Sequence, residues 1–176
     1  MAVAHKAPPG SAHAGETTAA RALPVVLRVM AGLLWLSNVD WKVPPEFGKS
    51  GGECGGLCGF VQAGADHGPP GWSWLMAHVV LPNLTAFGYA TLLIEVALAV
   101  LLLSGTLTRG AALAGAAQSL VIGLSVANAP GEWYWSYVLM VALHLAVYSL
   151  AAGRTYGVDA VLRRRPGRSR WLEALT

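Results

Sequence analysis

The sequence predicts an all-α integral membrane protein, a four-helix bundle with an extracytoplasmic loop between its first and second helices. Hydrophobic residues make up 55% of the 176 residues and charged residues only 12%, a composition typical of membrane bundles. Four apolar stretches are each long enough to cross a bilayer. Lysine and arginine gather on one side of these stretches, as the positive-inside rule requires of a four-pass chain.

The four apolar stretches are expected to form one transmembrane domain over residues 21–154. The first begins near Leu23 and no small-residue cleavage site follows it, so we expect a retained helix and not a secretory signal. The third is rich in Ala, Gly and Ser, which lets helices approach closely in lipid. The fourth opens on the aromatic run WYW, typical of a membrane interface. The predicted spans are residues 23–39, 84–104, 111–127 and 133–152.

Three segments are expected to lie outside the membrane. Residues 1–20 are rich in Ala, Gly, Pro and Thr without apolar periodicity, which predicts a disordered cytoplasmic tail. Residues 41–77 contain two Pro-Pro pairs and the segment GGECGGLCG, which break helices and predict an extracytoplasmic loop. Near its end, Trp72 and Trp74 are expected to anchor an interfacial segment. Residues 155–176 predict a basic cytoplasmic tail.

The distribution of Lys and Arg sets the predicted orientation. Two lie in the N-terminal tail, one in the turn TLTRG and six at the C-terminal end, whereas the loop holds only Lys42 and Lys49. Both termini are therefore expected in the cytoplasm and the loop outside. The basic residues form no face interleaved with aromatic ones, so anionic membrane lipids are the expected partners and nucleic acid is not.

Each predicted span carries one strongly polar residue: Arg28, Glu95, Gln118 and His144 in turn. A charged side chain that faces hydrocarbon costs several kcal/mol unless it turns inward and finds a partner. Counted from the cytoplasmic ends of the spans, a rise of about 1.5 Å per residue places all four roughly 9 to 14 Å deep. We therefore expect them to share one polar centre.

The polar centre has two interpretations, and the first is structural. Arg28 and Glu95 would form an ion pair, with Gln118 and His144 as hydrogen-bonding partners that fix the helix register. The second interpretation is a binding site for the polar head group of a ligand.

A quinone ring needs hydrogen-bond donors for its two carbonyl oxygens and apolar or aromatic walls around them. Besides Arg28 and Gln118, residues Trp35 and Tyr148 are predicted to contact such a ring, because helical spacing places Tyr148 on the same face as His144. Quinone reduction takes up protons, so Glu95 and His144 are the candidate catalytic residues.

Cys54 and Cys58 lie together in the predicted outer loop. An oxidising location and flexible intervening glycines favour a structural disulfide. Exchange of electrons with a partner thiol is the redox alternative. Their spacing matches no zinc motif, so no metal is predicted.

Three segments of the chain resemble the DoxX/DoxD family of four-helix bacterial and archaeal membrane proteins. They read RVMAGLLWLSNVDWK, IEVALAVLLLSGTLTRGAAL and WSYVLMVALHLAVYSLAAGRTYGVDAVL, and the likeness extends over residues 28–162. The residues that match the family pattern are Arg28, Glu95, Gly105, Thr108, Arg109, Gly153, Arg154, Gly157 and Asp159.

The resemblance implies a multi-pass subunit of a quinone-linked oxidoreductase in the bacterial plasma membrane, of which the thiosulfate:quinone type is one form. It also implies quinone as cofactor and a partner subunit or a homo-oligomer. Two alternatives from other classes stay open. One is a noncatalytic scaffold or accessory subunit that recruits a redox partner, and the other is a small carrier that uses the polar residues as a pathway.

Overall fold

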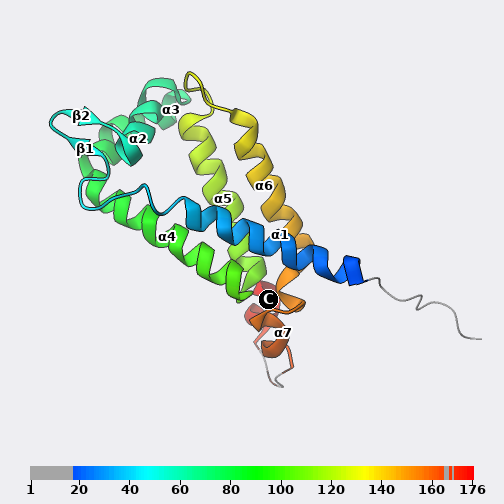
Figure 1. Ribbon diagram of the computed structural model, residues 1–176. Coiled ribbons are helices and arrows are strands. Elements are labelled where there is room, and N and C mark those ends of the chain that lie inside the picture. Colours follow the sequence, from blue (N-terminus) through cyan, green and yellow to red (C-terminus); the bar gives the residue numbers. More distant parts are fainter. Residues whose placement is uncertain (1–17, 165–166, 168) are drawn as a thin grey trace, which may run out of the picture.

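A computed structural model describes residues 18–164, 167 and 169–176 of the chain, which is mostly helical, at 74%. The predicted N-terminal tail lies mainly outside these residues. Figure 1 shows α4 and α5 converging near the turn at Gly105 and spreading apart toward α2 and α3, with α6 beside α5. The four longest described helices are α1 (Thr18–Ser37), α4 (Leu84–Ser104), α5 (Thr108–Val126) and α6 (Tyr134–Ser149).

Among the described residues, three helical segments are long and apolar enough to cross a membrane. They are Ala20–Ser37, Pro70–Ser104 and Thr108–Val126, while α6 is equally apolar in character but has only 16 residues. Large apolar side chains such as Leu93 and Val138 are exposed on the outer faces of α4 and α6. Apolar surface of this extent is unusual on a soluble monomer. The helical class is confirmed, and the four-pass topology stays a prediction.

The long helices pack closely where small residues face a neighbour. Helix α1 packs on α4, α5 packs on α6, and further contacts join α4 to α5 and α1 to α6. A Cβ atom on Gly32 would lie 2.8 Å from Cγ of Leu103, so α1 and α4 approach at a distance that glycine permits. Gly115 of α5 likewise has no side chain, and the ring of His144 from α6 fills the space beside it.

Residues 41–77, predicted as an extracytoplasmic loop with helix-breaking composition, are largely folded into short helices and a hairpin. Gly51 and Gly52 have positive φ angles of 57° and 88° at a hairpin turn, as a two-residue turn of this kind requires. Leu57 and Val61 are one helical turn apart and bury one side of α2, which packs against α5. The elements are β1 (Lys49–Ser50), β2 (Glu53–Cys54), α2 (Gly56–His67), α3 (Pro70–Leu75), the π-helix η1 (Met76–Val80) and the 3-10 turn η2 (Leu81–Asn83), which leads into α4.

The described part of residues 155–176, predicted as a basic cytoplasmic tail, is partly helical. It forms α7 (Val158–Leu162) and α8 (Arg170–Leu175), preceded by the 3-10 turn η3 (Ala152–Arg154). These elements pack against one another and against α5. Arg154 donates to the carbonyl oxygen of Thr176 at 3.0 Å. Arg165 and Arg168, which contribute to the predicted basic character, lie outside the described residues.

Candidate functional site: a cavity with a buried ion pair

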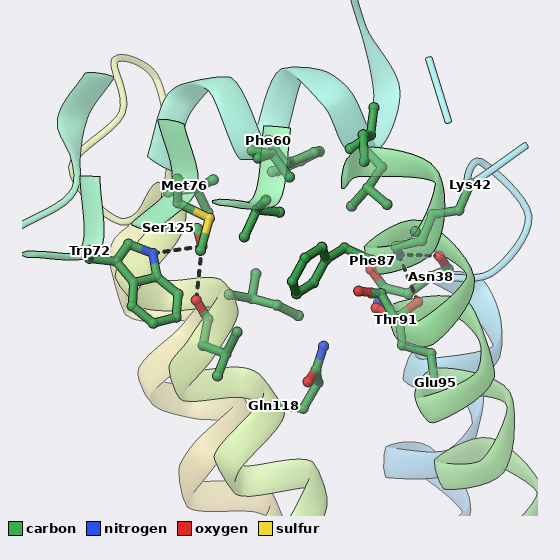
Figure 2. A pocket seen from close by; sticks show the side chains of 18 of the residues that line it. Asn38, Lys42, Phe60, Trp72, Met76, Phe87, Thr91, Glu95, Gln118 and Ser125 are labelled. Atoms are coloured by element: carbon green, nitrogen blue, oxygen red, sulfur yellow. Dashed lines mark hydrogen bonds and ion pairs between the residues drawn. The ribbon is translucent and has the colours of Figure 1, made fainter. Parts of the chain in front are cut away.

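A cavity of about 300 Å³ lies where α4 and α5 spread apart, under α2 and α3. We call it the ion-pair cavity (Figure 2). Its walls are mostly apolar and aromatic, and most of its few polar side chains come from the chain just after α1, from α4 and from α5. The apolar and aromatic lining residues include Trp41, Leu57, Phe60, Val61, Trp72, Leu75, Met76, Val80, Leu84, Phe87, Val121, Ile122 and Val126.

One wall of the cavity carries a fully buried ion pair. Nζ of Lys42 lies 2.8 Å from Oε2 of Glu95, and the two side chains are 3% and 0% exposed. The same Nζ donates to the carbonyl oxygen of Asn38 at 2.5 Å and lies over the ring of Trp41. The second carboxylate oxygen of Glu95, Oε1, has no hydrogen-bond donor among the described residues. A buried carboxylate with one open oxygen can accept a further hydrogen bond.

The chain after α1 folds back to bring Lys42 to Glu95. Phe47 is fully buried and packs so closely on Gly88 of α4 that a Cβ there would lie 2.5 Å from its ring. This contact holds the segment against α4, a short distance along the helix from Glu95. Burial lowers the pKa of Lys42, and the neighbouring carboxylate partly offsets that effect.

Gln118 projects into the cavity from α5 across from Glu95, as Figure 2 shows. Its side chain is half-buried, and no hydrogen bond to it is found within the described part of the chain. Thr91, one helical turn before Glu95 on α4, also lines the cavity. The amide, the hydroxyl and the open carboxylate oxygen therefore offer both donors and acceptors to a bound group.

The opposite side of the cavity is fixed by a polar contact between α3 and α5. The indole nitrogen of Trp72 donates to Oγ of Ser125 at 3.1 Å, and that hydroxyl donates to the carbonyl oxygen of Val121 at 3.0 Å. Trp72, which is predicted to anchor at the interface, closes one end of the cavity, and its interfacial position stays a prediction. Trp74 is exposed and stacks on His78.

Arg28 does not meet Glu95, contrary to the predicted ion pair. Its guanidinium donates to the carbonyl oxygens of Leu102 at 3.2 Å and Leu103 at 3.3 Å, and to that of Tyr156 at 3.4 Å. It therefore satisfies the last carbonyl groups of α4, where a cation also complements the helix dipole. Arg28 takes no part in the cavity.

Asp159 plays the matching role at the start of α5. Its carboxylate accepts from the backbone N–H groups of Leu107 at 2.7 Å and Thr108 at 2.9 Å, and its own N–H donates to the carbonyl oxygen of Gly105 at 2.9 Å. Gly105 has a φ of 68°, and a side chain there would collide with Arg28. A side chain on Gly153 would likewise collide with Asp159. We call Arg28, Gly105, Gly153 and Asp159 the capping cluster, because they lie where α4 ends and α5 begins.

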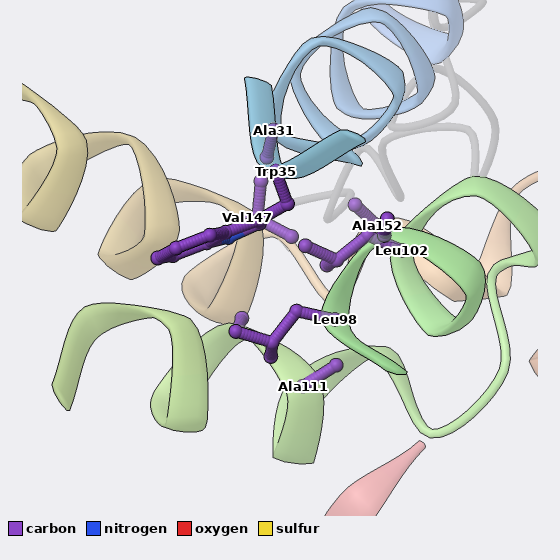
Figure 3. Packing of buried hydrophobic residues seen from close by; sticks show 9 residues of the cluster. Ala31, Trp35, Leu98, Leu102, Ala111, Val147 and Ala152 are labelled. Carbon is purple, nitrogen blue, oxygen red and sulfur yellow. The ribbon is translucent and has the colours of Figure 1, made fainter. Parts of the chain in front are cut away.

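His144 and Trp35 pair with each other inside the apolar core. The indole nitrogen of Trp35 donates to Nε2 of His144 at 2.7 Å, and Nδ1 lies 2.7 Å from the carbonyl oxygen of Met140. Both side chains are fully buried, and Figure 3 shows Trp35 beside Leu98 and Val147. Both nitrogens of His144 are occupied, and neither residue lines the cavity. The predicted polar centre shared by all four spans is therefore wrong.

Tyr148 also lies away from the cavity. Its ring packs under the guanidinium of Arg109 at 4.4 Å, near the Gly105 turn. Of the six predicted catalytic and quinone-contacting residues, Glu95 and Gln118 line the cavity. The structure adds Lys42, which the sequence predicts only as a residue of the outer loop.

Cys54 and Cys58 form a disulfide with a Cα–Cα distance of 5.1 Å. It joins β2 to the first turn of α2. Cys58 is buried in an apolar cluster that includes Phe47, Leu57 and Val61. Among the described residues, no group of three or more His, Cys, Asp or Glu side chains could hold a metal ion.

Comparisons of the chain with models of known protein families, with curated proteins and with solved structures gave no match.

Proposed function

We propose that the chain is a DoxX/DoxD-like membrane protein that binds a quinone ring in the ion-pair cavity and serves a quinone-linked oxidoreductase. The resemblance over residues 28–162 supports the family. Three helical segments of sufficient length, with α6 as a shorter fourth, support a four-span arrangement. We place both termini in the cytoplasm of a bacterial cell, because Lys and Arg concentrate at the ends of the sequence.

The observation that carries the quinone proposal is the open Oε1 of Glu95 in a mostly apolar cavity. Leaving a buried polar atom without a partner costs free energy, which a bound hydroxyl or ordered water would offset. Lys42 and the amide of Gln118 can donate to the carbonyl oxygens of the oxidised ring. Oε1 of Glu95 can accept from a hydroxyl of the reduced ring.

The chain's own contribution to quinone chemistry would be positioning and proton transfer. A bound quinone supplies the electron acceptor. Glu95 is the residue placed to take up or release a proton at the ring, and Lys42 holds it in position. His144 is not assigned this role, because both of its nitrogens are engaged in the core. Electrons would come from a partner subunit, to which the outer elements β1, β2 and α2 are accessible.

Substitution of Gln118 tests the proposal with little risk to folding. Gln118→Leu keeps the size of the side chain and removes a donor that has no partner within the described residues. The affinity of the purified protein in lipid nanodiscs for a tail-free benzoquinone should fall about fivefold, since one hydrogen bond contributes about 1 kcal/mol. Bound quinone is measured by mass spectrometry after equilibrium dialysis, with protein-free nanodiscs as the blank.

Gln62→Leu is the matched control, because it makes the same chemical change on α2, where Gln62 bonds Asp66 and does not line the cavity. Its affinity for quinone should equal that of the wild type. Equal quinone binding by wild type and Gln118→Leu would reject this site, and no binding by the wild type would favour a noncatalytic scaffold.

A further inference from the structure

The side chains that line the ion-pair cavity differ in how much of their surface is exposed on the outside of the protein. On the roof, Leu57 and Val61 of α2 and Met76 of η1 are each less than 10% exposed. On the α1 side, Lys42 and Glu95 close the wall and are also buried. The roof therefore presents packed apolar side chains to water, and the α1 side is closed by a buried ion pair.

Among the described residues, two large apolar side chains that line the cavity are exposed. Phe87 of α4 and Val121 of α5 both line the cavity and are both 41% exposed. They stand on the two helices that spread apart around the cavity (Figure 1). Each belongs to a helical segment long and apolar enough to cross a membrane. Both exposed lining residues therefore lie on the part of the surface that carries apolar side chains.

We infer that the space between Phe87 and Val121 is a lateral portal from the bilayer into the ion-pair cavity, and that the ligand is a lipid-borne ring with a hydrocarbon tail. This inference rests on the proposed function of the cavity and adds the route and the tail. The polar ring lies against Glu95, Lys42 and Gln118 inside, and the tail passes out between α4 and α5.

The chemistry of the walls agrees with a ligand of this shape. Beyond the polar wall, the lining toward the portal is apolar, with Phe87, Val121 and Ile122 on the path. An alkyl tail that leaves the cavity between these side chains stays in contact with apolar groups throughout, at no desolvation cost. A fully water-soluble ligand would instead need a polar path through the roof, and the buried residues there do not provide one.

A bulky side chain at the portal should discriminate between ligands with and without a tail. Val121→Phe narrows the gap without touching the polar wall. The affinity for a benzoquinone with a decyl tail should fall about tenfold, since overpacking of a filled space has a cost of this size. The affinity for the same ring without a tail should fall several-fold less, because no tail has to pass through the narrowed gap. Leu113→Phe, exposed on α5 and away from the cavity, is the matched control and should change neither.

A second variant guards against misfolding at position 121. Phe87→Ala widens the portal from the other helix, and it should raise the affinity for a ring with a bulkier, branched tail relative to the affinity for the tail-free ring. Suppose that the wild type binds both rings and that Val121→Phe lowers both affinities equally or lowers neither. This result would overturn the portal and leave the proposed function intact. If the wild type binds neither ring, the proposed function fails, and the portal with it.

Discussion

The capping cluster and the ion-pair cavity are both built from polar side chains on apolar helices, but they satisfy those side chains differently. In the capping cluster, Arg28 and Asp159 direct their groups to backbone carbonyl and N–H groups at the end of α4 and the start of α5. In the cavity, Glu95 has one partner in Lys42 and one open oxygen, and Gln118 has no partner among the described residues. A polar residue in an apolar helix is thus structural where its side chain meets backbone groups of a neighbouring element, and ligand-directed where it faces a cavity.

The ion pair gives the largest expected effect on stability. Lys42→Met leaves Glu95 buried without its cation, which should lower the free energy of unfolding by about 3–5 kcal/mol. The double variant Lys42→Met/Glu95→Leu replaces both charges with apolar groups and should recover most of that loss, but it should not bind quinone. Thermal unfolding in detergent micelles, followed by circular dichroism, measures both variants. A Lys42→Met variant as stable as the wild type would contradict the buried pair.

Removal of the cation of the capping cluster should affect stability and leave binding unchanged. Arg28→Met deletes charged donors to carbonyl groups at the end of α4, and should destabilise the protein by about 1.5–3 kcal/mol. Its affinity for quinone should equal that of the wild type, because Arg28 does not line the cavity. Unfolding and quinone dialysis on the same preparation separate the two effects. Quinone loss at unchanged stability would return Arg28 to the binding site that the sequence predicted.

Loss of the anionic cap should have a smaller effect. Asp159→Ala leaves the N–H groups of Leu107 and Thr108 without their acceptor and should cost about 0.5–2 kcal/mol. Asp159→Asn keeps one acceptor oxygen and should lose less. Hydrogen exchange measured by mass spectrometry should show faster exchange at the first turn of α5 in Asp159→Ala. Slower or unchanged exchange there would show that the cap does not hold this helix end.

The sequence predicted the long helices well and the polar centre poorly, for physical reasons. Long apolar runs leave a helix as the main way to satisfy the backbone in lipid, and the predicted span 84–104 coincides with α4. The four polar side chains would share one depth only if each stayed at the level of its own Cα. Arg28 instead reaches the carbonyl groups at the end of α4, and Lys42 is brought to α4 by a backward fold of the chain.

The folded character of residues 41–77 was also missed, because their glycines and prolines masked a short amphipathic pattern. Leu57 and Val61 mark the buried side of α2, but 12 residues rich in Gly and Ala give a weak signal. The resemblance to the DoxX/DoxD family did point to residues that cluster, since Arg28, Gly105 and Asp159 meet at one end of the helices. The pattern lists these residues but does not predict that they meet, and Lys42, three residues after the predicted first span, was the available sign of a partner for Glu95.

Thr91 gives the smallest expected effect and the finest distinction between the two regions. Thr91→Val keeps the shape of the side chain and removes a half-buried hydroxyl that lines the cavity. Stability should change by less than about 0.5 kcal/mol, and affinity for tail-free quinone should fall about twofold to threefold if the hydroxyl contacts the ring. Ser119→Ala is the control, because that hydroxyl bonds the carbonyl oxygen of Gly115 within α5 and does not line the cavity. A larger stability loss in Thr91→Val than in Ser119→Ala would mean that polar groups of the cavity support the fold, as those of the capping cluster do.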